Sequence, residues 1–219
     1  MKLIKQVIKK FLPLQLIIII KDIIDNTKLE KANAEEIARW NKQGKPSPPP
    51  HAIKQEVIGE FRKKFNIETL IETGTFHGLM IYAQKTKFKK IVSIEIDKSL
   101  YEEALKKFSI YNHIELHCGD SAHVLKKVVR DYDYPCLYWL DGHYSGGVTG
   151  KGKYTTPILE ELKTIFDSDI NHIVLIDDAR FFTGEDDYPT IEGLRLLIKK
   201  LRPKYIVDNQ NDIIRLYSI

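Results

Sequence analysis

The sequence LIETGTFHG, from Leu70 to Gly78, decides the fold of this 219-residue chain. An apolar segment ends in an acidic residue, Glu72, and the chain then turns through two glycines toward an expected helix. A second apolar segment, IVSIE at 91–95, follows and also ends on a carboxylate. Doubly wound α/β folds hold a nucleoside with such a glycine turn and an acid at the tip of the next strand. Glu95 is therefore placed to accept hydrogen bonds from two ribose hydroxyls.

The spacing of the glycines separates the candidate cofactors. The dinucleotide fingerprint is G-x-G-x-x-G, whereas this turn has the spacing Glu-x-Gly-x-x-x-Gly. A carboxylate inside the turn would repel a pyrophosphate, but it suits the ammonium or sulfonium region of S-adenosylmethionine. A nicotinamide dehydrogenase is disfavoured for the same reason. In the alternative interpretation, Glu72 only caps the helix after a tight strand–helix turn.

The two motifs, IETGTFHG and VSIEID, resemble the class I S-adenosylmethionine-dependent methyltransferases, and most of all the catechol O-methyltransferase branch. In CGDS, Asp120 resembles the family position that contacts the adenine amino group, and Ile96 would pack on the adenine face. The alternative for Asp120 is an N-cap of the following helix. The resemblance implies S-adenosylmethionine as cofactor, with these binding residues: Glu72, Thr73, Gly74, Thr75, Phe76, Gly78, Glu95, Ile96, Asp120, Ser121 and Asp141.

From residue 67 onward, strand and helix patterns alternate along the chain. Strands are expected at 67–72, 91–95, 113–117, 136–140, 172–176, 204–207 and 213–217, with helices at 76–84, 98–108, 122–131, 156–167 and 190–201. Repeated strand–helix units predict a parallel sheet with helices on both faces. The last two strands have no helix between them and must pair antiparallel. The fold class is therefore α/β, a Rossmann-like seven-stranded methyltransferase sheet, mostly parallel, with a C-terminal antiparallel hairpin.

The residues before this pattern form an N-terminal helical extension and a proline-rich linker, assigned to 1–50, with the cofactor-binding domain at 51–219. Lysines alternate with apolar residues at helical spacing in 1–12, Pro13 interrupts, and LQLIIII follows at 14–20. That run is too short to span a bilayer. Residues 1–31 are either a basic amphipathic helix on an anionic membrane surface, or helices that pack on the domain or on a second subunit. A separate polar helix is expected at 32–40.

Composition narrows the partners and the compartment. The net charge of +4 lies largely near the N-terminus, and the nearly balanced remainder indicates no nucleic-acid footprint. Cys118 and Cys136 each fall in an expected strand, about three strand spacings or roughly 14 Å apart in methyltransferase strand order. This separation is too large for a disulfide. We expect buried, reduced thiols in a cytoplasmic protein, with peripheral membrane contact as an addition to that location.

Three carboxylates follow the fourth and fifth expected strands. Asp141 lies in YWLDGHYSGG, and Asp177 and Asp178 lie in IVLIDDAR. Converging carboxylates repel one another unless a positive group lies between them, and Mg²⁺ takes oxygen ligands of this kind. The catechol branch and the macrolide-sugar O-methyltransferases resemble this pattern, which implies Mg²⁺ ligation by all three residues, although catechol enzymes usually carry Asn at the Asp178 position. Alternatively, Asp141 orients the methionine amine and Asp177 caps a turn.

The implied reaction is methylation of a hydroxyl. Mg²⁺ lowers the pKa of a bound hydroxyl, a base removes its proton, and the oxygen attacks the sulfonium methyl. Catechol enzymes carry a lysine three residues after the strand-four Asp, where this chain has Tyr144. His143 is then the best candidate for the base, with a loop histidine as the alternative. We expect catalysis by His143 and Asp141, and substrate contacts from Tyr144 and Arg180. Lys151, Lys153 and Arg180 are candidates for holding a phosphate or carboxylate.

Two residues before the first strand have an open role. His51 and Lys54 stand at the start of a helix expected over 53–65, after the prolines at 46–50. They either reach the active site as part of a lid or lie in solvent.

The sequence thus predicts a Mg²⁺-assisted O-methyltransferase that acts on a sugar or another polyhydroxylated small molecule or glycan. The whole pattern also looks like methyltransferase-like proteins associated with bacterial surface polysaccharide. The alternatives are a metal-independent methyltransferase with His143 as base, and a non-catalytic cofactor-binding scaffold docked to a membrane partner.

Overall fold

The computed structural model describes residues 13–142 and 156–219. The chain divides into two compact units, one ending at Pro46 and one spanning Ser47–Ile219. None of the helices in the described ranges is long and apolar enough to cross a membrane.

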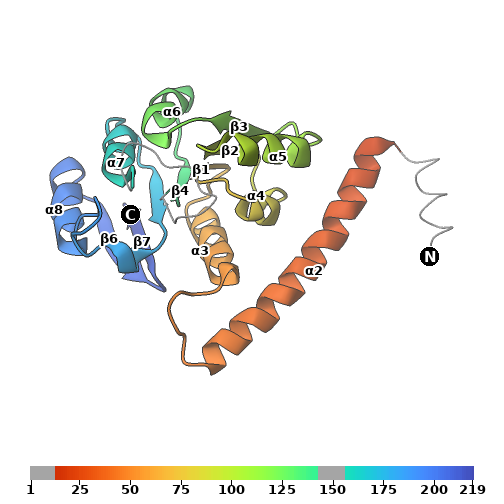
Figure 1. The fold of residues 1–219 in the computed structure, drawn as a ribbon, viewed down its shortest axis with the longest axis horizontal. Helices are drawn as coiled ribbons and strands as arrows, with labels where there is room; N and C mark the ends of the chain where they lie inside the picture. The colour runs from red at the N-terminus through yellow and green to blue at the C-terminus, as the bar shows by residue number, and fades with distance from the viewer. Residues whose placement is uncertain (1–12, 143–155) are drawn as a thin grey trace. The chain divides into compact units, whose positions relative to one another are not determined.

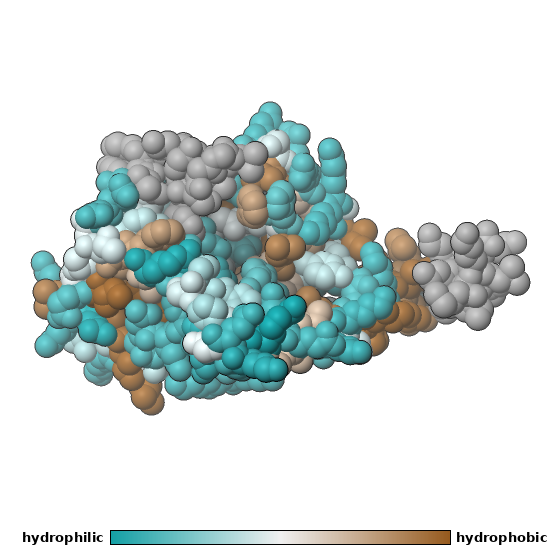
Figure 2. All heavy atoms as spheres, turned by 60° about the horizontal axis from the view of Figure 1, so that its bottom comes forward, coloured by the Kyte–Doolittle hydropathy of each residue, from teal (hydrophilic) through white to brown (hydrophobic). Residues whose placement is uncertain are grey.

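The first unit is built on a single long helix, α2 (Leu14–Lys42). Pro13 precedes it, and the backbone N–H groups of Leu16 and Ile17 donate to the Pro13 carbonyl. The separate polar helix expected at 32–40 is part of α2, because no proline or glycine interrupts the chain between positions 14 and 42. After α2 the chain folds back, so that the Trp40 indole donates to the Pro46 carbonyl at 2.8 Å. The first turns of α2 expose large hydrophobic side chains (Figure 2), including Leu14, Ile19 and Ile23.

The second unit contains one seven-stranded sheet with the order β3-β2-β1-β4-β5-β7-β6. The parallel strands are β1 (Thr69–Thr73), β2 (Lys90–Glu95), β3 (Ile114–Cys118), β4 (Leu137–Leu140) and β5 (Ile173–Ile176). The closing hairpin is β6 (Ile206–Gln210) and β7 (Ile213–Tyr217), and β7 pairs antiparallel with both β5 and β6. This architecture confirms the predicted fold class.

Helices cover both faces of the sheet (Figure 1). On one face lie α3 (His51–Lys64), α4 (Leu79–Gln84) and α5 (Lys98–Phe108); on the other lie α6 (Ser121–Val128), α7 (Ile158–Phe166) and α8 (Ile191–Leu201). Apolar side chains of the second group pack with alternate strand residues into one buried core. Two short 3-10 turns, η1 (Val129–Asp131) and η2 (Ala179–Phe181), complete the elements.

Several expected boundaries differ from the observed ones for local reasons. The helix expected from 76 starts at Leu79, because Phe76 and Gly78 have positive φ values of 48° and 67°, which an α-helix does not allow. The hairpin turn is shorter than expected, because β6 continues to Gln210. Asn211 and Asp212, with φ of 55° and 59°, form a two-residue turn of the kind that suits strand twist.

The two cysteines are free, and three strand steps separate β3 from β4, as expected. The expectation that both thiols are buried is wrong for Cys118. β3 is an edge strand, and its last residue, Cys118, is exposed, whereas Cys136 is buried at the entry to β4.

The strand order reverses between β1 and β4, in the middle of the sheet. The chain leaves β1 toward β2 on one side and returns to β4 on the other, so a crevice forms outside the carboxyl ends of these two strands.

Candidate active site

The turn after β1 lies against the end of β4. The Gly74 N–H donates to the Ile94 carbonyl at 2.9 Å, and Gly74 has a φ of +88°. A Cβ on this residue would stand 2.8 Å from the carbonyl carbon of Asp141. Glycine is therefore required here both by backbone conformation and by close approach.

Glu95 is the last residue of β2 and is buried beside this turn. Its Oε2 accepts the Phe76 N–H at 2.7 Å, and its Oε1 accepts the Asp97 N–H at 2.9 Å. The two backbone bonds fix the carboxylate, and each oxygen keeps a further lone pair. The position at the strand tip is as expected, and the ribose role remains a prediction.

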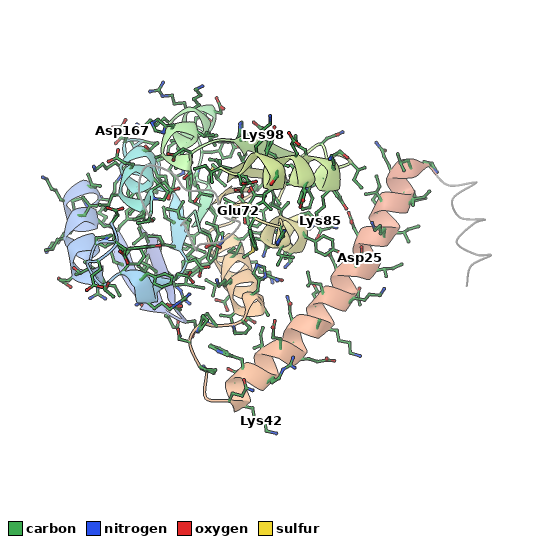
Figure 3. All side chains as sticks on the ribbon, viewed as in Figure 1. Asp25, Lys42, Glu72, Lys85, Lys98 and Asp167 are labelled. Atoms are coloured by element: carbon green, nitrogen blue, oxygen red, sulfur yellow. The ribbon has the colours of Figure 1, made fainter. Side chains whose placement is uncertain are left out.

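Glu72 lies inside the fold rather than capping a helix. Figure 3 shows it in the interior of the unit, whereas Lys98 and Asp167 lie at the outside. Its Oε2 accepts a hydrogen bond from the Ser93 hydroxyl at 2.6 Å, and Gly78 occupies the N-cap position of α4. Burial, reinforced by the charge of Glu95, raises the pKa of the Glu72 carboxyl to about 8.

The residues predicted around the adenine follow the neighbouring strands β2 and β3. Asp120 is the N-cap of α6, and its side chain accepts the Ala122 N–H at 2.9 Å, so the capping interpretation is confirmed. Ser121 is buried as the first residue of α6, and Ile96 is half-buried after β2. The Gly119 N–H donates to the Glu95 carbonyl at 2.8 Å, which joins this loop to the tip of β2.

The predicted carboxylate cluster is present. Asp141 follows β4 and Asp177 follows β5, held by backbone bonds of 3.0 Å to the Thr73 and Leu140 carbonyls. One carboxylate oxygen each of Asp141, Asp177 and Asp178 lies within 4.8 Å of the others. Asp178 has a φ of +56°, a left-handed conformation that Asp tolerates better than most residues.

Lys54 points from α3 into this cluster. Its Nζ is paired with Asp177 Oδ2 and lies 3.7 Å from Asp178 Oδ1. Burial alone would lower the pKa of this ammonium, but Asp177, Asp141 and Asp178 together raise it above the ordinary value. The interpretation of Lys54 as a solvated residue is therefore wrong, because a helix face delivers it to the strand ends.

His51 lies one helical turn before Lys54. Its Nδ1 is 2.6 Å from Gln55 Nε2. Burial and the neighbouring Lys54 lower the pKa of His51 to about 4, so this imidazole is neutral near pH 7.

Arg180 links the cluster to the C-terminal hairpin. Its Nη1 donates to Asp178 Oδ1 at 2.7 Å and is also paired with Asp212. The Arg180 and Ala179 N–H groups donate to the side chain and the carbonyl of Asp212 at 2.8 and 2.9 Å. Its Nη1 is thus engaged with two carboxylates of the protein, and the contact of Arg180 with substrate remains a prediction.

Sequence reasoning missed Glu161, a buried acid on α7. The buried residues of this helix are Ile158, Glu161, Leu162, Ile165 and Phe166. An acid within an apolar stripe of helical period was the signal that could have identified it. Glu161 and Asp177 both line a cavity of about 10 Å³ at the ends of β4 and β5 and the start of α7, and burial raises the pKa of Glu161 to about 7.

The remaining predicted residues, His143, Tyr144, Lys151 and Lys153, lie outside the described residues.

Three solved structures illustrate what this chain resembles. The O-methyltransferase TomG from Streptomyces achromogenes, involved in tomaymycin synthesis and in complex with SAM, aligns with a TM-score of 0.53 and 16% identity over 86% of this chain and 90% of its own. The SAH-bound methyltransferase PaMTH1 of Podospora anserina gives 0.52 and 17%, covering 87% of each chain. An O-methyltransferase from Bacillus cereus in complex with SAH gives 0.52 and 13%, over 85% and 91%. No family model and no curated protein matches the sequence.

The fold is therefore that of the S-adenosylmethionine-dependent methyltransferases. The coverage shows that the likeness extends over nearly the whole of each chain. At identities of 13–17% the comparison shows the fold alone.

Proposed function

We propose that this protein transfers a methyl group from S-adenosylmethionine to a hydroxyl oxygen. One observation carries the proposal: the Gly74 turn lies against the end of β4, with buried Glu72 and Glu95 at the tips of adjacent strands. In a sheet of this topology, that edge is the ligand crevice. Solved structures with the same fold are described as complexes with SAM or SAH.

Each acid has a distinct role in the proposed complex. The Glu95 carboxylate accepts the ribose hydroxyls, and Glu72 faces the methionine ammonium. Asp120 and Ser121 meet the adenine edge while Ile96 packs on its face. Thr73, Thr75, Phe76 and Gly78 shape the turn, whose backbone N–H groups approach the cofactor.

The transfer breaks the bond from sulfur to the methyl carbon and forms a bond from that carbon to the acceptor oxygen. The hydroxyl proton leaves to a base, for which we propose His143, and S-adenosylhomocysteine is the second product. The enzyme contributes orientation and exclusion of water.

The donor set of Asp141, Asp177 and Asp178 fits Mg²⁺, since three carboxylates offer the hard oxygen ligands that this ion takes. When bound there, Mg²⁺ would lower the pKa of an acceptor hydroxyl. Lys54 already contacts two of these carboxylates. Its ammonium supplies positive charge at the same place, which also supports the metal-independent alternative.

The polar surroundings favour a sugar or another polyhydroxylated acceptor. The carboxylates after β4 and β5 and the partly exposed Arg180 offer hydrogen-bond partners to hydroxyl groups. Tyr144 is proposed as a further substrate contact. The link to surface polysaccharide rests on the sequence resemblance alone.

The first unit suggests a second kind of partner. Leu14, Ile19 and Ile23 of α2 are 68%, 53% and 61% exposed. We propose that the protein is cytoplasmic and that residues 1–31 bind either the anionic cytoplasmic face of a membrane or a second copy of the chain. A non-catalytic scaffold that keeps the cofactor site would use the same segment.

Calorimetry with S-adenosylhomocysteine, followed by methyl transfer from labelled cofactor to a panel of polyols and glycans, tests the proposal. Glu95→Ala should weaken binding of the product by the loss of charge-assisted hydrogen bonds worth about 1.5–3 kcal/mol each. Wild-type protein that binds neither cofactor nor product refutes the methyltransferase function. Binding without transfer to any hydroxyl acceptor would favour the scaffold.

A further inference from the structure

Lys54 lies next to the carboxylate cluster because the helix that carries it, α3, packs tightly on the rest of its unit. The neighbouring α3 residues Ala52, Ile53, Val57 and Ile58 are buried. The Gln84 side chain of α4 donates to the Gln55 carbonyl at 3.1 Å, which ties the two helices together. The lysine side chain is 17% exposed and the Asp177 side chain only 1%. The ion pair is therefore held from both sides by packed elements.

Two basic side chains, Arg180 and Lys54, form ion pairs with the carboxylates of the cluster. Arg180 pairs with Asp178 and, outside the cluster, with Asp212. In the part of the chain that the structure describes, the ion pair of Asp177 is with Lys54. A buried carboxylate without a partner is strongly disfavoured. Lys54 stabilises the charge of Asp177, together with the Asp178 N–H that donates to Asp177 Oδ1 at 2.9 Å.

A divalent cation would bind the same three carboxylates that surround the Lys54 ammonium. Mg²⁺ binds carboxylate oxygens at about 2.0–2.1 Å, and Lys54 Nζ is in contact with Asp177 Oδ2. The double charge of the ion would also repel the ammonium at this short range. The two cations therefore compete for the cluster.

We infer that Lys54 is the built-in counter-ion of the carboxylate cluster and competes with divalent cations for it. The lysine positions Asp177 beside the acceptor crevice, and its charge weakens the binding of a metal ion at the same carboxylates. The assignment of this crevice to an acceptor rests on the proposed function. The competition itself depends only on the cluster.

Manganese(II), followed by electron paramagnetic resonance of the free ion, measures the competition directly. Lys54→Met keeps the length of the side chain and removes its charge, so it should bind Mn²⁺ at least about tenfold more tightly than wild type. Lys63→Met removes the same charge from an exposed position of α3, and screening should keep its affinity within about twofold of wild type. Adding Asp177→Asn to Lys54→Met should abolish the gain.

Equal Mn²⁺ affinity of Lys54→Met and wild type would overturn the inference, as would an equal gain in Lys63→Met. If Lys54→Met does not fold, Lys54→Gln is titrated in its place, since the amide can still donate to Asp177. Circular dichroism confirms folding for every variant. Calorimetry of S-adenosylhomocysteine on the same proteins tests the proposed function independently. If wild type does not bind S-adenosylhomocysteine but Lys54→Met still gains Mn²⁺ affinity, the proposed function is refuted and the competition between Lys54 and divalent cations is supported.

Discussion

Replacing Glu72 with Gln should change how cofactor binding depends on pH. This carboxyl is fully buried, bonded to Ser93 and close enough to Glu95 to feel its charge. Its pKa of about 8 means that the residue is mostly protonated in the free protein at neutral pH. The ammonium of S-adenosylhomocysteine, if it lies beside Glu72 as proposed, favours the carboxylate. Binding must then expel the proton.

The size of the effect follows from the pKa. One pH unit below a pKa of about 8, roughly nine tenths of the carboxyls are protonated. Binding at pH 7 should therefore release about 0.9 proton, and affinity should rise about tenfold per pH unit between pH 6 and 7. Above the folded pKa the rise should flatten. Glu72→Gln should show neither the release nor the slope.

Isothermal calorimetry at pH 7, in two buffers with different ionisation enthalpies, counts the protons. Glu68→Gln is the matched control, because Glu68 is an exposed acid just before β1, and it should keep the wild-type release. Tight binding by wild type without proton release would refute the placement of the ammonium beside Glu72. A variant Glu72→Gln that kept the full pH slope would refute it as well.

Three further outcomes are expected. Gly74→Ala should lower the free energy of unfolding by more than about 1 kcal/mol in urea titrations, because the new Cβ would clash with the Asp141 backbone. The control Gly59→Ala, with no atom within 4 Å of the new Cβ, should be neutral or stabilising. Equal losses of stability in the two variants would contradict the close approach of Gly74 to Asp141. Burial raises the pKa of Glu161 from 4.5 to about 7, so wild type should lose about 2.5 kcal/mol of stability from this group between pH 5 and 8. Glu161→Gln should keep that stability, and identical pH profiles in urea would count against a buried ionisable acid. Ile23→Glu on α2 should reduce sedimentation with anionic vesicles if this helix binds membranes. Asn41→Glu, which adds the same charge at an exposed position near the far end of α2, serves as the control. Unchanged sedimentation after Ile23→Glu would show that the apolar surface does not bind the vesicles.

Much of the sheet could be predicted because its signals are local. Each parallel strand is a short apolar run, and the carboxyl ends of such strands meet at one edge. Glu95, Asp141 and Asp177 could therefore be expected at one edge of the sheet from the sequence. The antiparallel closing pair followed from the absence of a helix between positions 207 and 213.

The remainder depends on contacts that periodicity does not encode. Lys54 stands on a helix whose neighbours in space are set by packing, so its sequence position did not reveal that it reaches β5. Cys118 is exposed because β3 is an edge strand, which is a property of the whole sheet. The late start of α4 arises from the positive φ of Phe76, a residue type that rarely adopts this conformation.

The bond between Asp212 and the loop after β5 has a consequence for the order in which the protein acquires its site. Asp212 lies in the turn that leads into β7, and it holds Ala179 and Arg180 next to Asp178. Its side chain also accepts a hydrogen bond from Ser47, which stands before the first strand. A ribosome makes Asp141, Asp177 and Asp178 well before Asp212. A nascent chain that already contains the three carboxylates therefore still lacks the residue that holds Arg180 beside Asp178. The cluster is therefore completed only after the turn at Asp212 and the strand β7 have been made.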